Sequence, residues 1–491
     1  MKIALIVPRN GSDKEKNFYD YRYYSKFLLS KKYFSYLLAI PTLLSLTPPE
    51  HEVRVFDENI EDIDYDWNAD LAGITVRTMF ANRAYQISDT YRKKGVKTVL
   101  GGIHPSMCTD EALKHSDAVV IGEAEQVWSD LLHDAGNGGL KKTYRADGKV
   151  DLKAYPTPVR TKIARDRYLI DLVQTTKGCP FHCEFCSVHA FDGQRIRNKT
   201  VDQVVQEIKD ISMEEGKYKK KAILFADDNI LANRKYSREL FKTLKQYNLN
   251  WSCQASINIS RDEETLRLIR EAGCGAVFIG LESISEENLS RMDKGVNRRH
   301  DFITAIQKIQ SYGMLVHGSF ILGYDFDTNK SFDELIEFIN EGKLLSPIIN
   351  ILTPFPGTKL YDRMDQEGRI LHKDWSRYDS KNVVFKPALL SPEELLEGYR
   401  KVLRAIYSFD VIYEKLKYYW DTDFWKDANA KDPVKMKYRI LFAIRLCSFL
   451  FSTNMSRSKF ILKILPKVFN KRVRVSTILS LMAYNDFAYS V

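Results

Sequence analysis

The sequence predicts an α/β protein with three parts: an N-terminal doubly wound parallel sheet, a central partial (β/α)6 barrel and a C-terminal helical extension. Short apolar runs alternate with amphipathic helical patterns up to about residue 365, which is typical of parallel sheets covered by helices. Polar or glycine-rich segments follow these runs. After about residue 365 helical periodicity dominates. The chain has 491 residues, of which 44% are hydrophobic, so it exceeds one ordinary domain.

The first part covers residues 1–145. Its predicted strands lie at residues 2–8, 52–56, 71–75, 98–100 and 118–121, with helical periodicity between several of them. Doubly wound sheets bind ligands beyond the carboxyl ends of their strands. One loop at these ends has paired glycines, which allow a backbone to approach a bulky ligand closely. The candidate ligand contacts in such loops are Thr75, Gly101, Gly102 and Glu123.

Residues 146–166 are polar and contain prolines, which predicts a linker. The predicted barrel covers residues 167–365. Its strands end in polar or glycine-bearing segments near residues 175, 227, 256, 283, 325 and 353, and amphipathic helices separate them. Barrels of this kind carry their chemistry at the carboxyl ends of the strands, so these segments hold the candidate site residues.

Three cysteines, Cys179, Cys183 and Cys186, follow the first barrel strand at the spacing C-x-x-x-C-x-x-C. Thiolates are soft ligands that select iron–sulfur clusters or zinc. A closed zinc site and an electron-transfer [4Fe–4S] cluster both take four ligands, so three cysteines leave one iron open for a small molecule. Two alternatives are a zinc knuckle completed by His182 or His189, and a disulfide. The other four cysteines are scattered, as in proteins of reducing compartments.

Two adjacent acids, Asp227 and Asp228, end the second barrel strand. Adjacent carboxylates are costly to keep ionised without a cationic partner, which favours a cationic ligand. The alternative is a plain helix cap. In the loop after the cysteines, Arg195 and Arg197 either meet a carboxylate or phosphate of a cofactor or belong to a solvated loop.

The cysteine spacing and the order of the strand-end segments resemble the radical S-adenosylmethionine (SAM) superfamily. In that family the open iron chelates the amino and carboxylate groups of SAM, and an aromatic residue such as Phe185 precedes the third cysteine. Asp-Asp-Asn stands here where the family usually has G-G-E, so the resemblance implies that Asp227 or Asp228 binds the SAM ammonium. The further cofactor contacts that it implies are Ser256 and Glu282 at the ribose or carboxylate, and the backbone of Ile321 and Gly323 beside the adenine.

The first part resembles the cobalamin-binding domain that precedes the radical SAM domain in one large subfamily. The matching pieces are residues 46–53, 55–59, 101–105 and 122–125. Domains that ligate cobalt from below use D-x-H-x-x-G, which does not occur here, and His51 and His104 lie in other contexts. The resemblance therefore implies that the loop residues named above bind cobalamin with no histidine beneath the cobalt. The alternative is a domain that has lost the corrinoid.

Residues 227–229, 323–325 and 396–399 look most like the hopanoid 2-methylase branch, and the magnesium-protoporphyrin cyclase branch is more distant. This resemblance implies a C-methyltransferase acting on an unactivated carbon of a lipid or other small molecule. An external donor such as flavodoxin or ferredoxin would reduce the cluster, SAM would yield a hydrogen-abstracting radical, and methylcobalamin would donate the methyl group. This chemistry requires no general base, so no catalytic side chain is assigned. The alternatives are a radical SAM cyclase or rearrangement enzyme and a non-catalytic iron–sulfur sensor.

The net charge of +10 is spread along the chain without a nucleic-acid-binding motif, so we expect no nucleic acid partner. No apolar run is long enough to span a bilayer and no signal-peptide pattern precedes the first strand, which predicts a cytoplasmic protein. In the helical part, residues 366–491, the segment 458–472 mixes basic and apolar residues. It either docks on the inner face of the membrane or packs on the barrel.

Overall fold

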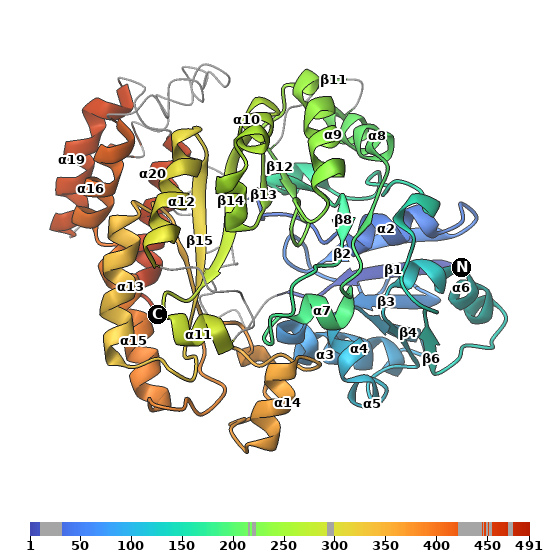
Figure 1. The fold of residues 1–491 in the computed structure, drawn as a ribbon. Helices are drawn as coiled ribbons and strands as arrows, with labels where there is room; N and C mark the ends of the chain where they lie inside the picture. Colours follow the sequence, from blue (N-terminus) through green and yellow to red (C-terminus); the bar gives the residue numbers. More distant parts are fainter. Residues whose placement is uncertain are drawn as a thin grey trace.

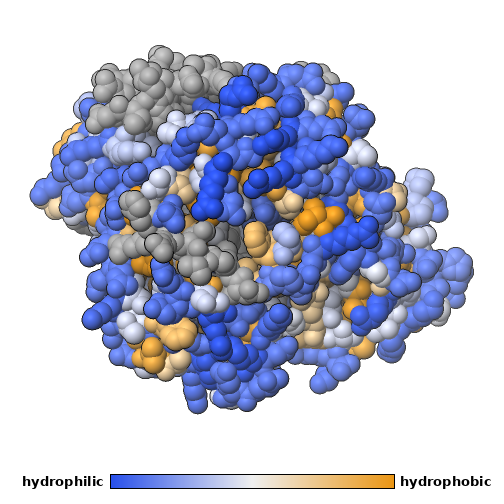
Figure 2. Space-filling model, in the orientation of Figure 1, coloured by the Kyte–Doolittle hydropathy of each residue, from blue (hydrophilic) through white to orange (hydrophobic). Residues whose placement is uncertain are grey.

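The computed structural model describes residues 1–9, 32–214, 217–218, 222–291, 299–420, 444, 446–447, 450, 454–469 and 475–491. Two six-stranded sheets lie side by side, and the C-terminal helices pack on the side of the second sheet that faces away from the first (Figure 1). This arrangement confirms the predicted fold class. Most apolar side chains lie in three buried clusters, and the face shown in Figure 2 is largely hydrophilic, with apolar side chains in small groups.

The first sheet has the strand order β2-β1-β3-β4-β5-β6, and all its pairs are parallel. Its strands are β1 (Lys2–Val7), β2 (Glu52–Asp57), β3 (Leu71–Thr75), β4 (Lys97–Gly101), β5 (Ala118–Ile121) and β6 (Thr143–Arg145). Helices α2 (Ala39–Leu46) and α6 (Trp128–Gly136) cover one face and α3 (Ala81–Lys93) the other, which is why these strands are continuous apolar runs. The strand β6 was not predicted, because its three residues form no apolar run.

The second sheet follows chain order, is parallel throughout and curls into a partial barrel. Its strands are β7 (Ile170–Val173), β12 (Ala222–Phe225), β13 (Trp251–Gln254), β14 (Cys274–Glu282), β15 (Leu315–Leu322) and β16 (Ile348–Ile351). The covering helices include α8 (Val201–Ser212), α9 (Arg234–Leu244), α10 (Glu263–Glu271), α12 (Arg299–Ser311), α13 (Asn329–Glu341) and α14 (Lys359–Gln366). Along β15 buried and half-buried residues alternate, because one face packs against helices and the other faces the barrel interior. After β7 comes a short antiparallel ribbon of β8 (Thr176–Lys177) and β9 (Arg197–Asn198).

Arg160, in the segment predicted as a linker, is 7% exposed and joins the two halves of the protein. Its guanidinium donates to the Tyr36 hydroxyl and to the Leu172 carbonyl, both at 2.7 Å, and pairs with the buried Glu207 of α8. Tyr36 precedes α2 of the first part, whereas Leu172 lies on β7. A buried ion pair is stable only when its hydrogen bonds are satisfied. The segment is therefore a fixed connection between the sheets and not a loose tether.

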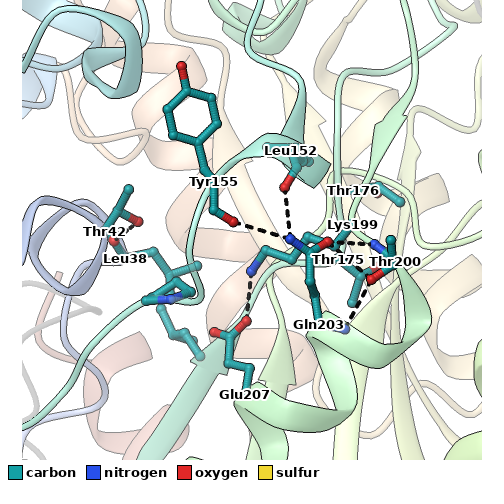
Figure 3. A network of polar contacts seen from close by, with 12 residues as sticks. Leu38, Thr42, Leu152, Tyr155, Thr175, Thr176, Lys199, Thr200, Gln203 and Glu207 are labelled. Carbon is teal, nitrogen blue, oxygen red and sulfur yellow. Dashed lines mark hydrogen bonds and ion pairs between the residues drawn. The ribbon is translucent and has the colours of Figure 1, made fainter. Parts of the chain in front are cut away.

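Helix α8 holds the neighbouring part of the same segment, as Figure 3 shows. The Gln203 side-chain amide donates to the Leu152 and Tyr155 carbonyls at 3.4 and 3.2 Å. Gln203 also completes a capping box, because its N–H donates to Thr200 Oγ1 at 3.1 Å and its side chain accepts from the Thr200 N–H at 2.8 Å. The cap that starts α8 thus also secures the connection between the sheets.

The C-terminal part contains α15 (Pro392–Ile406), α16 (Phe409–Trp420), α19 (Met455–Phe469) and α20 (Val475–Ala488). Among the side chains of α19 whose burial is described, the buried apolar ones are Phe460, Ile461 and Ile464. The ring of Phe460 stacks on Phe409 of α16 with centroids 5.0 Å apart, so this helix is packed against the protein. Membrane docking stays a prediction, and residues 470–472 of the segment lie outside the described residues. Among the described helices, none has the length and apolar character to cross a bilayer.

Gly398 on α15 marks a close approach to α13, since a Cβ atom there would lie 2.1 Å from the ring of Phe332. We expect Gly398→Ala to lower the free energy of unfolding by about 1–3 kcal/mol, because the buried ring cannot move without displacing its neighbours. Urea denaturation measures this effect. The control is Glu397→Ala, at the exposed neighbour, which should change stability by less than about 0.5 kcal/mol. A Gly398→Ala protein as stable as the parent would contradict the tight crossing.

Candidate functional site

A cavity of about 380 Å³ lies at the carboxyl ends of β12, β13 and β14. This volume is within the range of small-molecule sites. The residues predicted from the sequence that line it are Cys179, Cys183, Phe185, Cys186, Asp228, Ser256 and Glu282. Its apolar walls include Phe278, Leu281, Leu289 and Phe302. The barrel thus gathers candidate residues from positions 179 to 282 around one space.

The three cysteines lie on residues 178–196, which we call the cysteine loop; the ribbon of β8 and β9 forms its base. Gly178 begins the loop with a φ of 90°, and a Cβ atom there would lie 2.6 Å from the Arg195 carbonyl oxygen. Only glycine fits such a position without strain. Helix α14 holds the middle of the loop, because Arg363 pairs with the Glu184 carboxylate at 3.0 Å. The loop is therefore anchored at its start and at its centre.

The thiols of Cys179, Cys183 and Cys186 are free of disulfides and border the same cavity. In the part of the chain that the structure describes, no three His, Cys, Asp or Glu side chains converge so as to hold a single metal ion. A zinc knuckle needs such convergence, and the two candidate histidines both contact Gln194. A [4Fe–4S] cluster takes each thiolate on a different iron. Three cysteines that border one cavity could each ligate one iron of such a cluster.

The adjacent aspartates have different environments. Asp227 is fully buried, and its Oδ1 accepts from the N–H and hydroxyl groups of Thr175 and Thr176, which fastens the end of β12 to the end of β7. Burial raises the pKa of Asp227 to about 6. Asp228 borders the cavity, and burial together with repulsion from Asp192 and Asp227 raises its pKa to about 7. A cationic ligand in the cavity would stabilise the charged form of Asp228.

Glu282 and Ser256 both border the cavity beyond strand ends. Glu282 has a φ of 67° at an irregular step in the pairing of β14 with β15, and such strain at a non-glycine residue is typical of ligand sites. The Ser256 hydroxyl caps the next turn through a long contact of 3.4 Å with the Asn258 N–H. Sequence reasoning missed Gln254, Asn258 and Phe278, which line the same cavity. The sequence could have indicated these residues, because they lie near the ends of predicted strands or on the side of a strand that faces the barrel interior.

Ile321 and Gly323 are not among the described residues that line the cavity. Ile321 is half-buried on the barrel-facing side of β15. Gly323 has a φ of 100°, and a Cβ atom there would lie 2.7 Å from the Leu395 side chain of α15. Packing of that helix accounts for this glycine, and the adenine contact of both residues stays a prediction.

Thr75, Gly101 and Gly102 lie together at the carboxyl edge of the first sheet, where Thr75 pairs with Gly101. Gly102 has a φ of 105°, and a Cβ atom there would lie 2.9 Å from the Val76 carbonyl oxygen. A Cβ atom at Gly101 would have its nearest neighbour at 3.7 Å, which is ordinary contact. Gly102 is therefore needed because the Val76 backbone leaves no room for a side chain there. Gly101 has no such constraint and leaves space at the edge of the sheet.

Glu123, also predicted as a cofactor contact, has its carboxylate engaged by Lys177 and Arg197 at the base of the cysteine loop. Arg197, for which the sequence left a cofactor contact and a solvated loop open, thus meets a carboxylate of the protein itself. His104 is fully buried, with Nε2 3.1 Å from the Tyr85 hydroxyl. The side chains of Glu123 and His104 both have partners inside the protein.

Comparison with known proteins assigns the chain to a family. The family described as Radical SAM superfamily matches residues 173–339, and a Domain of unknown function (DUF4070) matches residues 358–489. Bacteriochlorophyllide d C-8(2)-methyltransferase from Chlorobaculum tepidum is 36% identical over 382 residues, which are 75% of this chain and 84% of that protein. The chain belongs to the radical SAM superfamily.

Further comparisons show which radical SAM enzymes this chain is similar to. Hopanoid C-2 methylase from Rhodopseudomonas palustris is 29% identical over 395 residues, which are 78% of this chain and 72% of that protein. This confirms the predicted resemblance, although the bacteriochlorophyllide methyltransferase is more similar. The solved structure of the cobalamin-dependent S-adenosylmethionine radical enzyme OxsB, with aqua-cobalamin and S-adenosylmethionine bound, has a TM-score of 0.63 at 15% identity. That match covers 98% of this chain and 78% of OxsB, so the two share their fold.

The two glycines at the edge of the first sheet should respond differently to substitution. We expect Gly102→Ala to lower the free energy of unfolding by about 1–3 kcal/mol, because its Cβ would press on the Val76 backbone. Gly101→Ala is the matched control and should stay within about 1 kcal/mol of the parent. Thermal or urea unfolding of the ligand-free protein measures both. Equal stability of the two variants would contradict the distinction.

Proposed function

We propose that the protein is a cobalamin-dependent radical SAM C-methyltransferase that carries a [4Fe–4S] cluster and acts on an unactivated carbon of a lipid or other small molecule. One juxtaposition carries the proposal. The loop whose three cysteines line the cavity is held to the carboxyl edge of the first sheet, because Lys177 at its base contacts Glu123 at 3.0 Å. Relatives named as methyltransferases and the fold shared with a cobalamin-dependent radical SAM enzyme support it.

The residues around the cavity suit the proposed cofactors. When bound, the cluster, SAM and cobalamin supply the electron, the radical source and the methyl carrier. The three cysteines would bind three irons, Asp228 the SAM ammonium, and Ser256 and Glu282 the ribose or carboxylate. The apolar walls of the cavity exclude water, which prevents side reactions of reactive species.

Cobalamin would lie at the carboxyl edge of the first sheet, against Thr75 and Gly101. Gly122 in the next loop supports this position, because a Cβ atom there would meet nothing within 4 Å and the backbone is open to a flat ligand. The buried contact of His104 with Tyr85 supports a cobalt with no histidine beneath it.

The names of the similar relatives and the exposed residues of α19 support the proposed substrate and partners. The similar relatives are named for bacteriochlorophyllide d and for hopanoids, which supports a lipid or pigment-like substrate. An external one-electron donor such as flavodoxin or ferredoxin would reduce the cluster. Exposed Lys459 and Lys463 on α19 would allow peripheral contact with an anionic membrane.

The aspartate that binds the SAM ammonium can be identified by a matched pair of variants. We expect Asp228→Asn to weaken SAM binding about tenfold or more, since a charge-assisted contact contributes roughly 1.5–3 kcal/mol. Asp227→Asn should weaken SAM binding less than Asp228→Asn does, because Asp227 binds Thr175 and Thr176 and does not border the cavity. Equilibrium binding of SAM to the reconstituted protein measures both. Equal weakening by the two variants would contradict the assignment.

Anaerobic reconstitution tests the proposed cofactors. We expect about four irons per chain, cobalamin retained through desalting after incubation with hydroxocobalamin, and formation of 5′-deoxyadenosine from SAM with a reductant. Cys183→Ala should abolish the cluster absorption and SAM cleavage while cobalamin stays bound. Stoichiometric zinc in place of iron, or a protein that cleaves SAM yet retains no cobalamin, would overturn the proposal.

The reaction type is tested separately by the mass of the product. Lipid and small-molecule extracts from cells with and without this gene should differ by compounds heavier by one methyl group. Growth with methyl-labelled methionine should move that label into the product. A product without an added methyl group would instead identify a cyclase or rearrangement enzyme.

A further inference from the structure

The base of the cysteine loop carries two cations directly opposite each other. Lys177 on β8 and Arg197 on β9 are register partners in the antiparallel ribbon. Like charges in such positions repel and weaken strand pairing. Their side chains are 16% and 7% exposed, so water screens the repulsion poorly. A ribbon with two residues per strand has little stability of its own, so its order depends on outside contacts.

Glu123 supplies the countercharge from the other half of the protein. Its carboxylate is 1% exposed and lies 3.0 Å from Lys177 Nζ and 2.7 Å from Arg197 Nη1. Glu125 adds a second contact with Lys177 at 2.9 Å. The Val150 N–H donates to Glu123 Oε2 at 3.0 Å, and the Val150 carbonyl accepts from Arg197 at 2.9 Å. Each of these buried charges therefore has an oppositely charged partner within ion-pair distance.

The barrel holds the opposite face of the same ribbon. Thr176 precedes Lys177 on β8 and donates its hydroxyl to Asp227 at 2.9 Å. Adjacent strand residues point to opposite faces. The ribbon is thus fixed on one face by Asp227 of the barrel and on the other by Glu123 of the first sheet.

We propose that Glu123 is a positioning residue for the cysteine loop: by neutralising Lys177 and Arg197 it lets the base of the loop close, so the N-terminal part is a structural component of the cluster site. The identity of the cluster rests on the proposed function, whereas the positioning role does not. Glu123 lies in the turn after β5, at the ligand-binding edge of the first sheet. One carboxylate therefore joins the carboxyl edge of the first sheet to the base of the cysteine loop.

Hydrogen–deuterium exchange on the metal-free protein tests this role without any cofactor. Glu123→Gln keeps the size of the side chain and removes its charge, which leaves the two cations unpaired. We expect the amides of residues 178–196 to exchange at least about tenfold faster in this variant. Unchanged exchange of these amides would overturn the proposal.

Two further variants separate positioning from a general loss of stability. Adding Lys177→Met to Glu123→Gln removes one of the opposed cations and should slow the exchange of the loop again. Glu207→Gln is the matched control, since Glu207 is also buried and held by two cations, Arg160 and Lys199, outside the loop. It should leave the loop's exchange within about threefold of the parent. Equal acceleration by Glu207→Gln, or no recovery in the double variant, would overturn the positioning role.

Iron content after anaerobic reconstitution gives an independent readout. Glu123→Gln should bind fewer irons per chain than the parent, and the double variant should bind more than Glu123→Gln. Equal iron content in all variants, together with a loop whose exchange does not change, would overturn the positioning role and leave the proposed function standing. A parent protein without iron would overturn the proposed function, while the exchange data would still decide the role of Glu123.

Discussion

Two sets of buried charges hold the two sheets against each other, and one of them, at Glu123, also holds the base of the cysteine loop. Glu123 binds the base of the cysteine loop, and Arg160 of the connecting segment binds Glu207 of the barrel. A charge removed from water is stable only while its partners stay in place. The two halves cannot shift against each other without leaving such charges unpaired. The carboxyl edge of the first sheet therefore stays in contact with the loop that carries the cysteines.

Neighbouring residues in the same motif have separate roles for a geometric reason. Asp227 ties two strand ends together, while Asp228 borders the cavity. Position 102 must be glycine because a side chain would press on the Val76 backbone, whereas Gly101 leaves space at the edge of the sheet. Consecutive residues near a strand end point in different directions, so one member can build the site and the other can face the ligand.

Local patterns predicted most of the fold because each depends on neighbours in sequence. The apolar runs of the sequence are the strands of the two sheets, as predicted. The patterns give no information where a tertiary partner decides the outcome. The polar segment 146–166 was interpreted as a linker, and only the structure shows that Arg160 within it is buried and paired with Glu207. The sequence left open whether the segment 458–472 docks on a membrane or packs on the barrel, and only the structure shows that Phe460 within it stacks on Phe409.

The sequence by itself determined the number and type of the candidate ligands, since three cysteines within eight residues need no tertiary information to be recognised. It also determined the alternation that produces two parallel sheets. Only the tertiary structure decided which aspartate faces the cavity and what Glu123 binds. Glu123 and Lys177 are 54 positions apart, and Asp227 and Thr175 are 52 apart. Their contacts depend on how strands and sheets lie against one another, and no local periodicity encodes that placement.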